Sequence, residues 1–179
     1  MHPDVAKILI TREEIAQKCK ELGKCISEEY KARNEIPVLV GLLSGSVPFL
    51  SELMRYIELD VTIDFMDVSS YDGAKTIGSI RIDKDLSTSA AGKTILLVED
   101  IVDTGTTLVE VKRMLANKGA KSVEVVSLLD KPERRTQDVQ AEYVGFKIPN
   151  EFVVGYGLDF NQKYRNLPYV GILKREIYE

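Results

Sequence analysis

Residues 95–108 read Ile-Leu-Leu-Val-Glu-Asp-Ile-Val-Asp-Thr-Gly-Thr-Thr-Leu. The first four form an unbroken β-prone apolar run, with a turn before it and acidic residues after it, which is typical of a parallel strand buried on both faces. Leu108, Val111 and Leu115 then recur at helical spacing. The stretch therefore predicts a central strand, a loop and an amphipathic helix.

The loop between this strand and helix carries groups suited to a phosphorylated sugar. Its turn, residues 104–107, offers hydroxyl donors, unpaired backbone N–H groups and the positive end of the helix dipole, all of which suit a phosphate. Glu99 and Asp100, where the strand ends, are suited to sugar hydroxyls or a divalent cation. Taken alone, such a turn is more often an ordinary helix N-cap followed by two exposed acids.

As a whole string, residues 98–105 resemble the phosphoribosyl pyrophosphate (PRPP) motif of the type I phosphoribosyltransferases, and specifically of their hypoxanthine-guanine branch. The resemblance implies that Glu99 and Asp100 face the ribose hydroxyls and Mg²⁺. It also implies that Asp103 borders PRPP, lies near N7 of a purine and acts as the general base. The residues that would hold the 5′-phosphate are Thr104, Gly105, Thr106 and Thr107.

The family fold is α/β, with a central, mainly parallel twisted sheet flanked by helices. The resemblance implies a core at about residues 36–145 and a small hood built from the N-terminal helix and the C-terminal segment, residues 1–30 and 146–179. A chain of 179 residues with 44% apolar content is long enough for one sizeable core. We therefore expect a single domain over residues 1–179.

Composition and termini narrow the function classes. Charged residues make up 29% of the chain and the net charge is −4, so the totals give no basic surface for nucleic acid and favour a small ligand. Residues 1–4 lack a basic flank and are not followed by an apolar stretch of signal-peptide length, and no segment reaches the length of a membrane span. We expect a cytoplasmic protein with neither nucleic acid nor membrane as a partner.

Cysteine and histidine contribute little to the expected chemistry. Cys19 and Cys25 fall on different faces of one predicted helix, which prevents a disulfide, and we expect both to be reduced. His2 is the sole histidine, so histidine-based triads and His/Cys metal sites are implausible. The chemistry must therefore use carboxylates, lysines, arginines and backbone amides, to which the resemblance adds Mg²⁺.

The N-terminal third predicts a helix and then a second strand–loop–helix unit. Thr11 and Glu14 form a capping-box signature for a helix that runs to about residue 30. Residues 38–43 are a core strand, and the turn that follows matches the pyrophosphate loop of the family. There Ser44 replaces the usual Lys or Arg, so Ser44 and Gly45 would bind pyrophosphate through their amides. The family often has a non-proline cis peptide in this loop, which we predict at Leu43–Ser44.

Residues 61–65 and 80–82 alternate apolar and polar side chains and predict two strands. From the residues alone, the segment between them is a polar β-hairpin with an Asp72-Gly73 turn. In the resembling family, Ser70-Tyr71 belongs to a mobile loop that closes over the reacting centre and excludes water.

Residues 123–129 predict a core strand that completes a βαβ crossover with the stretch at 95–108. Lys131 follows this strand. A lysine there is usually a solvated charge, but the carboxyl ends of parallel strands open on one crevice, and the family's lysine at this position reads the purine 6-oxo group and stabilises its charge during catalysis. Residues 133–135 are interpreted as a solvated loop without a role.

Residues 144–159 predict short strands with turns, and composition alone makes Phe152 a core residue. The resemblance instead implies that Phe152 stacks on the purine, that the backbone of Val153 reads the ring edge, and that Asp159 holds a second Mg²⁺. Arg165 matches the arginine that contacts pyrophosphate, whereas an arginine in an unmatched sequence is more often part of a surface ion pair.

The family's activity is purine salvage: transfer of the 5-phosphoribosyl group from PRPP to N9 of hypoxanthine or guanine, giving IMP or GMP and pyrophosphate. Xanthine use would depend on accommodating a 2-oxo group near Asp159. Family members are usually dimers or tetramers, so a homodimer or homotetramer is expected.

Two other functions stay open on the sequence. A PRPP-sensing regulator of the same fold would bind nucleic acid, but it would need a basic face. A phospho-receiver domain also places an acidic pair and a lysine at strand ends, but it leaves residues 104–107 and everything after Asp130 without a role.

Overall fold

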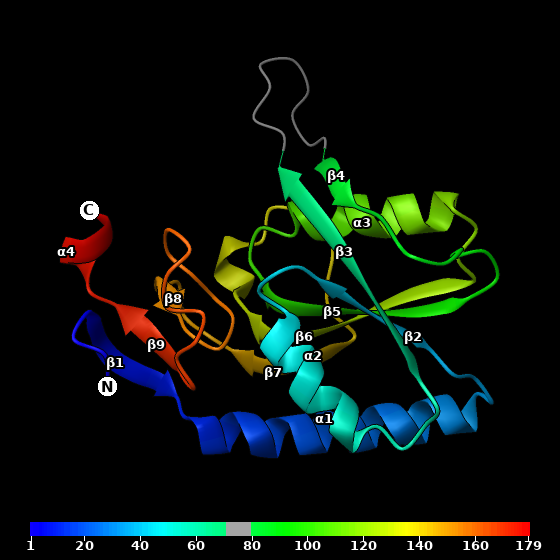
Figure 1. The fold of residues 1–179 in the computed structure, drawn as a ribbon, viewed down its shortest axis with the longest axis horizontal. Helices are drawn as coiled ribbons and strands as arrows, with labels where there is room; N and C mark the ends of the chain where they lie inside the picture. The colour runs from blue at the N-terminus through cyan, green and yellow to red at the C-terminus, as the bar shows by residue number, and fades with distance from the viewer. Residues whose placement is uncertain (71–79) are drawn as a thin grey trace.

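The computed structural model describes residues 1–70 and 80–179 (Figure 1). Tyr71 and the Asp72-Gly73 turn therefore lie outside the described residues, and Ser70 is the last residue of strand β3. No helix in the described part of the chain is both long enough and apolar enough to cross a bilayer.

A central sheet carries most of the core, as the sequence predicted. Within residues 1–70 and 80–179 it has six strands in the order β4-β3-β2-β5-β6-β7. Strands β3 and β4 are antiparallel, and the other neighbours are parallel. The strands are β2 (Val38–Leu42), β3 (Thr62–Ser70), β4 (Ile80–Lys84), β5 (Thr94–Val102), β6 (Ser122–Asp130) and β7 (Tyr143–Lys147).

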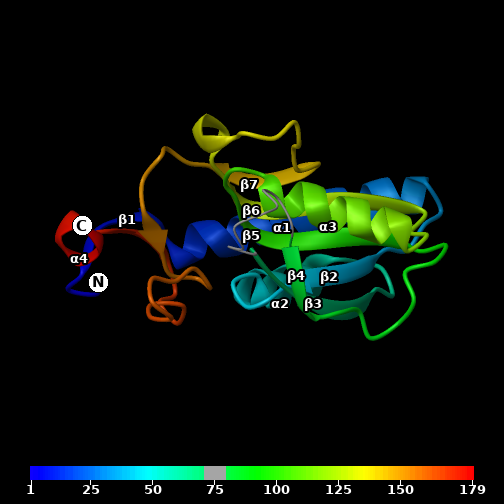
Figure 2. The same cartoon turned by 90° about the horizontal axis from the view of Figure 1, so that it is seen from above.

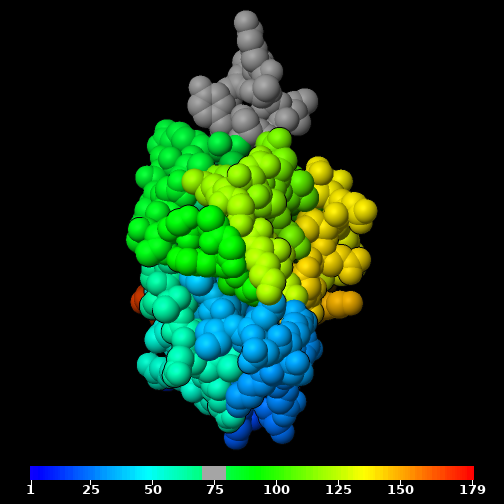
Figure 3. All heavy atoms as spheres, turned by 90° about the vertical axis from the view of Figure 1, so that its right-hand side faces the viewer, coloured from blue at the N-terminus to red at the C-terminus, as the bar shows by residue number. Residues whose placement is uncertain are grey.

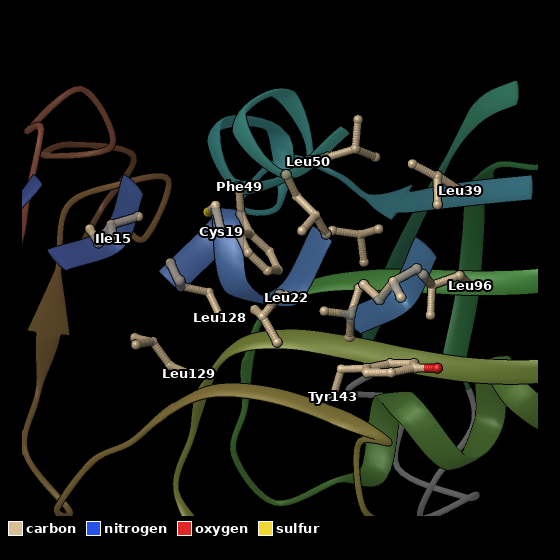
Figure 4. Packing of buried hydrophobic residues seen from close by; sticks show 14 of the residues in the cluster. Ile15, Cys19, Leu22, Leu39, Phe49, Leu50, Leu96, Leu128, Leu129 and Tyr143 are labelled. Atoms are coloured by element: carbon tan, nitrogen blue, oxygen red, sulfur yellow. The ribbon is translucent and has the colours of Figure 1, made fainter. Parts of the chain in front are cut away.

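Helices cover both faces of this sheet (Figures 1 and 2). Because successive side chains of a strand point to opposite faces, Leu96 and Val98 of β5 pack in one core cluster, while Ile95 and Leu97 pack in another. The first cluster contains residues of α1 (Arg12–Ala32) and α2 (Val47–Leu53). The short helix η1 (Met54–Tyr56) follows α2. The second cluster contains residues of α3 (Thr106–Asn117). Figure 4 shows the first cluster.

Helix α1 begins with the predicted capping box. The Glu14 amide donates to Thr11 Oγ1 at 3.2 Å, and the Thr11 amide donates to Glu14 Oε2 at 2.8 Å. The apolar stripe that includes Ile15, Cys19 and Ile26 is buried against the central sheet. The C-terminal end of α1 and the loop after α3 lie side by side (Figure 3). Lys121 of that loop pairs with Glu35, which follows α1.

A small antiparallel sheet stands beside the carboxyl ends of the central strands. It contains β1 (Val5–Ile10), β9 (Val170–Leu173) and β8 (Val153–Val154), paired in that order, and α4 (Arg175–Tyr178) follows β9. This sheet corresponds to the expected hood. Its N-terminal contribution is strand β1, whereas α1 belongs to the core of the central sheet.

Candidate active site

The carboxyl ends of β2 and β5 meet the small-sheet segment at a cavity of about 320 Å³. Because the strands are parallel, their ends open on the same side of the sheet, where α/β folds bind ligands. The structure thus brings together residues that the sequence placed far apart. Those lining this cavity are Ser44, Gly45, Glu99, Asp100, Asp103, Thr104, Gly105, Thr107, Asp159 and Arg165.

The turn after β5 presents the start of helix α3 to this cavity. Gly105 is the N-cap residue with φ +86°, a left-handed conformation that favours glycine. Thr104 Oγ1 donates to Thr106 Oγ1 at 3.2 Å and accepts from the Thr106 amide at 3.4 Å, so the two side chains support the turn. The first N–H groups of a helix have no partner within it, which leaves the turn able to bind an anion.

Glu99, which is buried, and Asp100, which is half-buried, form an acidic pair next to this turn. Burial, followed by the neighbouring Asp100 charge, raises the pKa of Glu99. Burial also raises the pKa of Asp100 to about 6, although hydrogen bonds from backbone amides and the charge of Arg165 oppose that rise. Two neighbouring carboxylates in such surroundings are costly without a compensating cation, so the cavity favours a positively charged or hydrogen-donating ligand.

The predicted pyrophosphate loop lies against this acidic pair. Its Leu43–Ser44 peptide is cis, as predicted. A Cβ at Gly45 would overlap the Asp100 carboxylate, and a Cβ at Gly157 would overlap the Gly45 carbonyl oxygen. Glycine is therefore required at both positions for the loop, the acid and the small-sheet segment to approach one another.

Arg165 is both part of an ion pair and part of the cavity wall. Its Nη2 lies 2.9 Å from Asp159 Oδ1, and its Nη1 donates to the Gly157 carbonyl at 2.7 Å. The interpretation of Arg165 as a surface ion pair is therefore incomplete, since the pair lines the cavity. An anionic ligand here would compete with Asp159 for the guanidinium.

A second cavity of about 450 Å³ adjoins the first and shares Ile101, Asp103 and Asp159 with it. Lys131 and Phe152 line this second cavity, together with Val153. Lys131 is only 7% exposed, not a solvated charge, and burial lowers its pKa. Phe152 is 37% exposed, which corrects its interpretation from composition as a core residue.

Asp103 lies where the two cavities meet. Its Oδ1 is buried and has no hydrogen-bond partner in the described part of the chain. Arg134 Nε lies 2.9 Å from this oxygen, at ion-pair distance but without hydrogen-bond geometry. Buried polar atoms are nearly always satisfied, so this oxygen is available to a ligand group that donates a hydrogen bond.

The interpretation of residues 133–135 as a solvated loop holds for Glu133 and Arg134, which are exposed, but is wrong for Arg135. The guanidinium of Arg135 is half-buried beside the site, where it pairs with Asp130 and contacts the Val139 carbonyl. It also donates to the Asp103 carbonyl at 3.1 Å and to the Val102 carbonyl at 3.4 Å. Arg135 therefore joins the ends of β5 and β6. The only sequence signal was an acid and an arginine five positions apart at a strand end, which is too common to be informative.

The residues present fit Mg²⁺. Carboxylate oxygens are its preferred protein ligands, and it usually binds through one or two carboxylates plus phosphate oxygens of a substrate. Glu99, Asp100 and Asp159 line one cavity and supply such oxygens. In residues 1–70 and 80–179, no three His, Cys, Asp or Glu residues are grouped to hold a metal by themselves, so the ion would be shared with substrate.

Comparison with known proteins identifies the family. Residues 7–161 match the family model described as the phosphoribosyl transferase domain. The hypoxanthine-guanine phosphoribosyltransferase of Staphylococcus epidermidis is 50% identical over 179 residues, covering 99% of each chain. The chain belongs to the hypoxanthine-guanine phosphoribosyltransferase family.

Other members of this phosphoribosyltransferase family extend the comparison. The bifunctional protein TilS/HprT of Listeria monocytogenes is 49% identical over 99% of this chain, which spans 27% of that longer protein. A crystal structure of a hypoxanthine phosphoribosyltransferase from Staphylococcus aureus has a TM-score of 0.94 at 49% identity, covering 100% of this chain and 97% of that one. The expected fold class is thereby confirmed.

Proposed function

We propose that this phosphoribosyltransferase transfers the 5-phosphoribosyl group from PRPP to N9 of hypoxanthine or guanine, giving IMP or GMP and pyrophosphate in purine salvage. The observation that carries the proposal is the pair of adjoining cavities that share Ile101, Asp103 and Asp159. One has the acids, amides and hydroxyls that suit a phosphorylated sugar. The other has an ammonium and an aromatic ring that suit an oxopurine. The names of the full-length relatives support the same activity.

On the sugar side, the amides and hydroxyls of residues 104–107 would bind the 5′-phosphate at the start of α3. Glu99 and Asp100 would hold the ribose hydroxyls and face the positive charge that develops on the ring. Glu99 and Asp100 would hold one Mg²⁺ and Asp159 a second, each together with substrate oxygens, and these ions would supply positive charge to offset the negative charge of the diphosphate.

Breaking the C1–pyrophosphate bond leaves negative charge on the departing diphosphate. The amides of Ser44 and Gly45 would bind this leaving group, and Arg165 would exchange its contact with Asp159 for one with the diphosphate. Charge stabilisation of this kind is often the largest contribution to catalysis.

On the base side, Phe152 would stack on the purine and the backbone of Val153 would contact its edge. Asp103 would accept the proton at N7, and its Oδ1, which makes no hydrogen bond within residues 1–70 and 80–179 but lies 2.9 Å from Arg134 Nε, is the atom placed for that role. Lys131 would donate to the 6-oxo group, and its low solvent exposure strengthens that interaction.

Other parts of the proposal stay predictions. Ser70 and Tyr71 would belong to a loop that closes over the reacting centre, a role that falls at and beyond the end of β3. Xanthine use, assembly as a homodimer or homotetramer, and a cytoplasmic location are likewise proposed from the family.

The deciding experiment is a spectrophotometric assay with PRPP, Mg²⁺ and each purine in turn. We expect hypoxanthine and guanine to be converted to their nucleotides, with turnover lost when EDTA removes Mg²⁺. Absence of transfer with every purine, together with tight binding of an oligonucleotide, would favour the nucleic-acid-binding regulator over the enzyme.

A further inference from the structure

The Phe152 ring contacts two other aromatic rings. Tyr178 of α4 stacks on it, with centroids 4.8 Å apart and an interplanar angle of 22°. Phe160 meets it at 5.6 Å and 89°. Tyr178 also lines the second cavity, together with Lys131 and Asp103. A residue from α4, far along the chain from the strand ends, therefore belongs to the wall of the proposed base site.

Tyr178 is held in place by the small sheet. Ile177 and Tyr178 pack on the apolar cluster of the small sheet, formed by Val5, Val154 and Leu173. Figures 1 and 2 both show the small sheet lying between α4 and the central sheet. Ile101 of β5 forms the cavity wall on the side of the central sheet. One face of the Phe152 ring is covered by Tyr178, which leaves the opposite face for a ligand in the cavity that both residues line.

The spacing of the two rings excludes a base between them. Atoms in stacking contact lie about 3.5–4.0 Å apart, so a purine sandwiched between two rings needs roughly twice that separation. The centroids of Phe152 and Tyr178 are only 4.8 Å apart. A base that stacks on Phe152 must therefore use the face opposite Tyr178.

The Phe152 ring needs support at this position. Its backbone is fixed, because its carbonyl accepts from the Leu173 amide at 2.8 Å. The side chain, however, is 37% exposed at the cavity wall, and the terminal torsion of a phenylalanine is broad. A parallel ring on one face restricts that torsion and keeps the plane of the Phe152 ring fixed at the cavity.

We propose that Tyr178 is a positioning residue for the base: it holds the plane of Phe152 so that the opposite face of that ring receives the purine. This inference rests on the proposed function. The proposed role depends on the ring of Tyr178 and not on its hydroxyl. It affects binding of the base and not binding of PRPP.

Steady-state kinetics of Tyr178→Leu, Tyr178→Phe and Ile177→Ala test this role. We expect Tyr178→Leu to raise KM for hypoxanthine about 3- to 10-fold, the ratio to which an aromatic pair interaction converts, while KM for PRPP stays within about twofold. Tyr178→Phe keeps the ring and should restore most of the affinity for the base. Ile177→Ala is the matched control, because it removes apolar packing from the same helix and cluster but leaves the stack intact.

Each other outcome contradicts a definite part of the proposal. An unchanged KM for hypoxanthine in Tyr178→Leu would overturn the proposal. An equal rise of this KM in Ile177→Ala would also overturn it, because it would show that α4 acts only by supporting the fold. A lower KM would mean that Tyr178 occupies the place of the base. Transfer by the unaltered protein is measured first: its absence overturns the proposed function and this inference with it, whereas the outcomes above overturn this inference alone.

Discussion

Gly45 and Arg135 illustrate how single residues fix the geometry of the site. Gly45 allows the pyrophosphate loop to lie directly against Asp100, since any side chain would overlap that carboxylate. Arg135 holds the main chain of Asp103 and pairs with Asp130, the residue before Lys131. The two residues proposed to act on the purine, Asp103 and Lys131, are thus positioned by one guanidinium.

Replacing Asp103 by asparagine tests the proposed general base. Asparagine keeps the shape of the side chain but cannot take a proton, so we expect kcat to fall on the order of a hundredfold or more, with little loss of PRPP affinity. Single-turnover rates and equilibrium binding of PRPP would separate the two effects. An unchanged kcat would remove Asp103 from the chemistry.

Replacing Arg135 by glutamine tests the contact beside the site. The variant leaves the buried Asp130 carboxylate without its partner, which costs about 3–5 kcal/mol of unfolding free energy. It also frees the Asp103 carbonyl, so kcat/KM should fall even at temperatures where the variant is fully folded. Urea unfolding and the transfer assay measure the two effects.

A charge-neutral pair of substitutions is the control for Arg135. In the double variant Asp130→Asn/Arg135→Gln no buried charge is unpaired, so much of the stability should return, while the Asp103 carbonyl still lacks its donor and activity should stay low. Glu133→Gln, a change in the same loop, should leave both quantities near their original values. Full recovery of activity in the double variant would show that the contact with the Asp103 carbonyl does not matter.

At the scale of elements, polar side chains fasten the end of α1 to the central sheet. Tyr30 donates its hydroxyl to Glu124 Oε2 on β6 at 2.8 Å, and Tyr143 on β7 donates to Glu29 Oε2 on α1 at 2.7 Å. Arg33 contacts both carboxylates. The network sets the position of α1 along the sheet, which apolar packing alone would determine less strictly.

Substitution Tyr30→Phe measures the contribution of this network. Tyr30 is 0% exposed, and its hydroxyl donates to a carboxylate. Loss of this hydroxyl should therefore lower the unfolding free energy by about 1.5–3 kcal/mol. Tyr56→Phe is the matched control, because its hydroxyl reaches Glu52 at 3.3 Å in a less buried place and should cost less. Equal losses in urea unfolding would contradict a special role for Tyr30.

For the molecule as a whole, the core continues from the central sheet into the small one. The cluster that contains Leu96 of β5 and Ile26 of α1 also contains Val153 and Val170 of the small sheet. That the chain unfolds as a single domain stays a prediction. We expect far-ultraviolet circular dichroism and tyrosine absorbance to give one coincident urea transition, whereas two separated transitions would contradict it.

The stability of the molecule should fall at alkaline pH. Burial raises the pKa of Cys19 to about 12 and raises the pKa of Tyr30 and of Tyr143 above the usual range for tyrosine. These groups therefore keep protons in the folded state that the unfolded chain releases from about pH 8.5 for cysteine and about pH 10 for tyrosine. By linkage, this contribution is complete below about pH 8.5 and is lost as pH rises toward 12.

Urea unfolding at a series of pH values measures this loss, and Cys19→Ala is the control. The variant should show a smaller decline over the whole range from pH 8.5 to about 12, because the folded protein keeps the thiol proton up to that pH, and the part of the decline above pH 10 that comes from the tyrosines should remain. A free energy of unfolding that is constant from pH 8 to 11 would contradict the assignment of these groups as buried and protonated.

Local patterns in the sequence predicted the elements of the central sheet and their meeting point, but not strands β1 and β9 of the small sheet. Alternation, helical spacing and turn residues depend on neighbours within a few positions, and the ends of parallel strands must open on one side. The string from Val98 to Gly105 therefore locates the site by itself, and the capping box at Thr11 locates the start of α1.

Contacts between distant residues are decided only by the tertiary structure. The apolar alternation of β3 suggests that Ile63 faces the core, yet Ile63 is 47% exposed and Asp64 is buried. Two groups stabilise the buried Asp64 carboxylate: Lys84 at the end of β4 and the Ser87 amide in the chain after it. Arg135 and Tyr178 reach the site in the same way. Their partners are set by packing between elements, which no short-range pattern encodes.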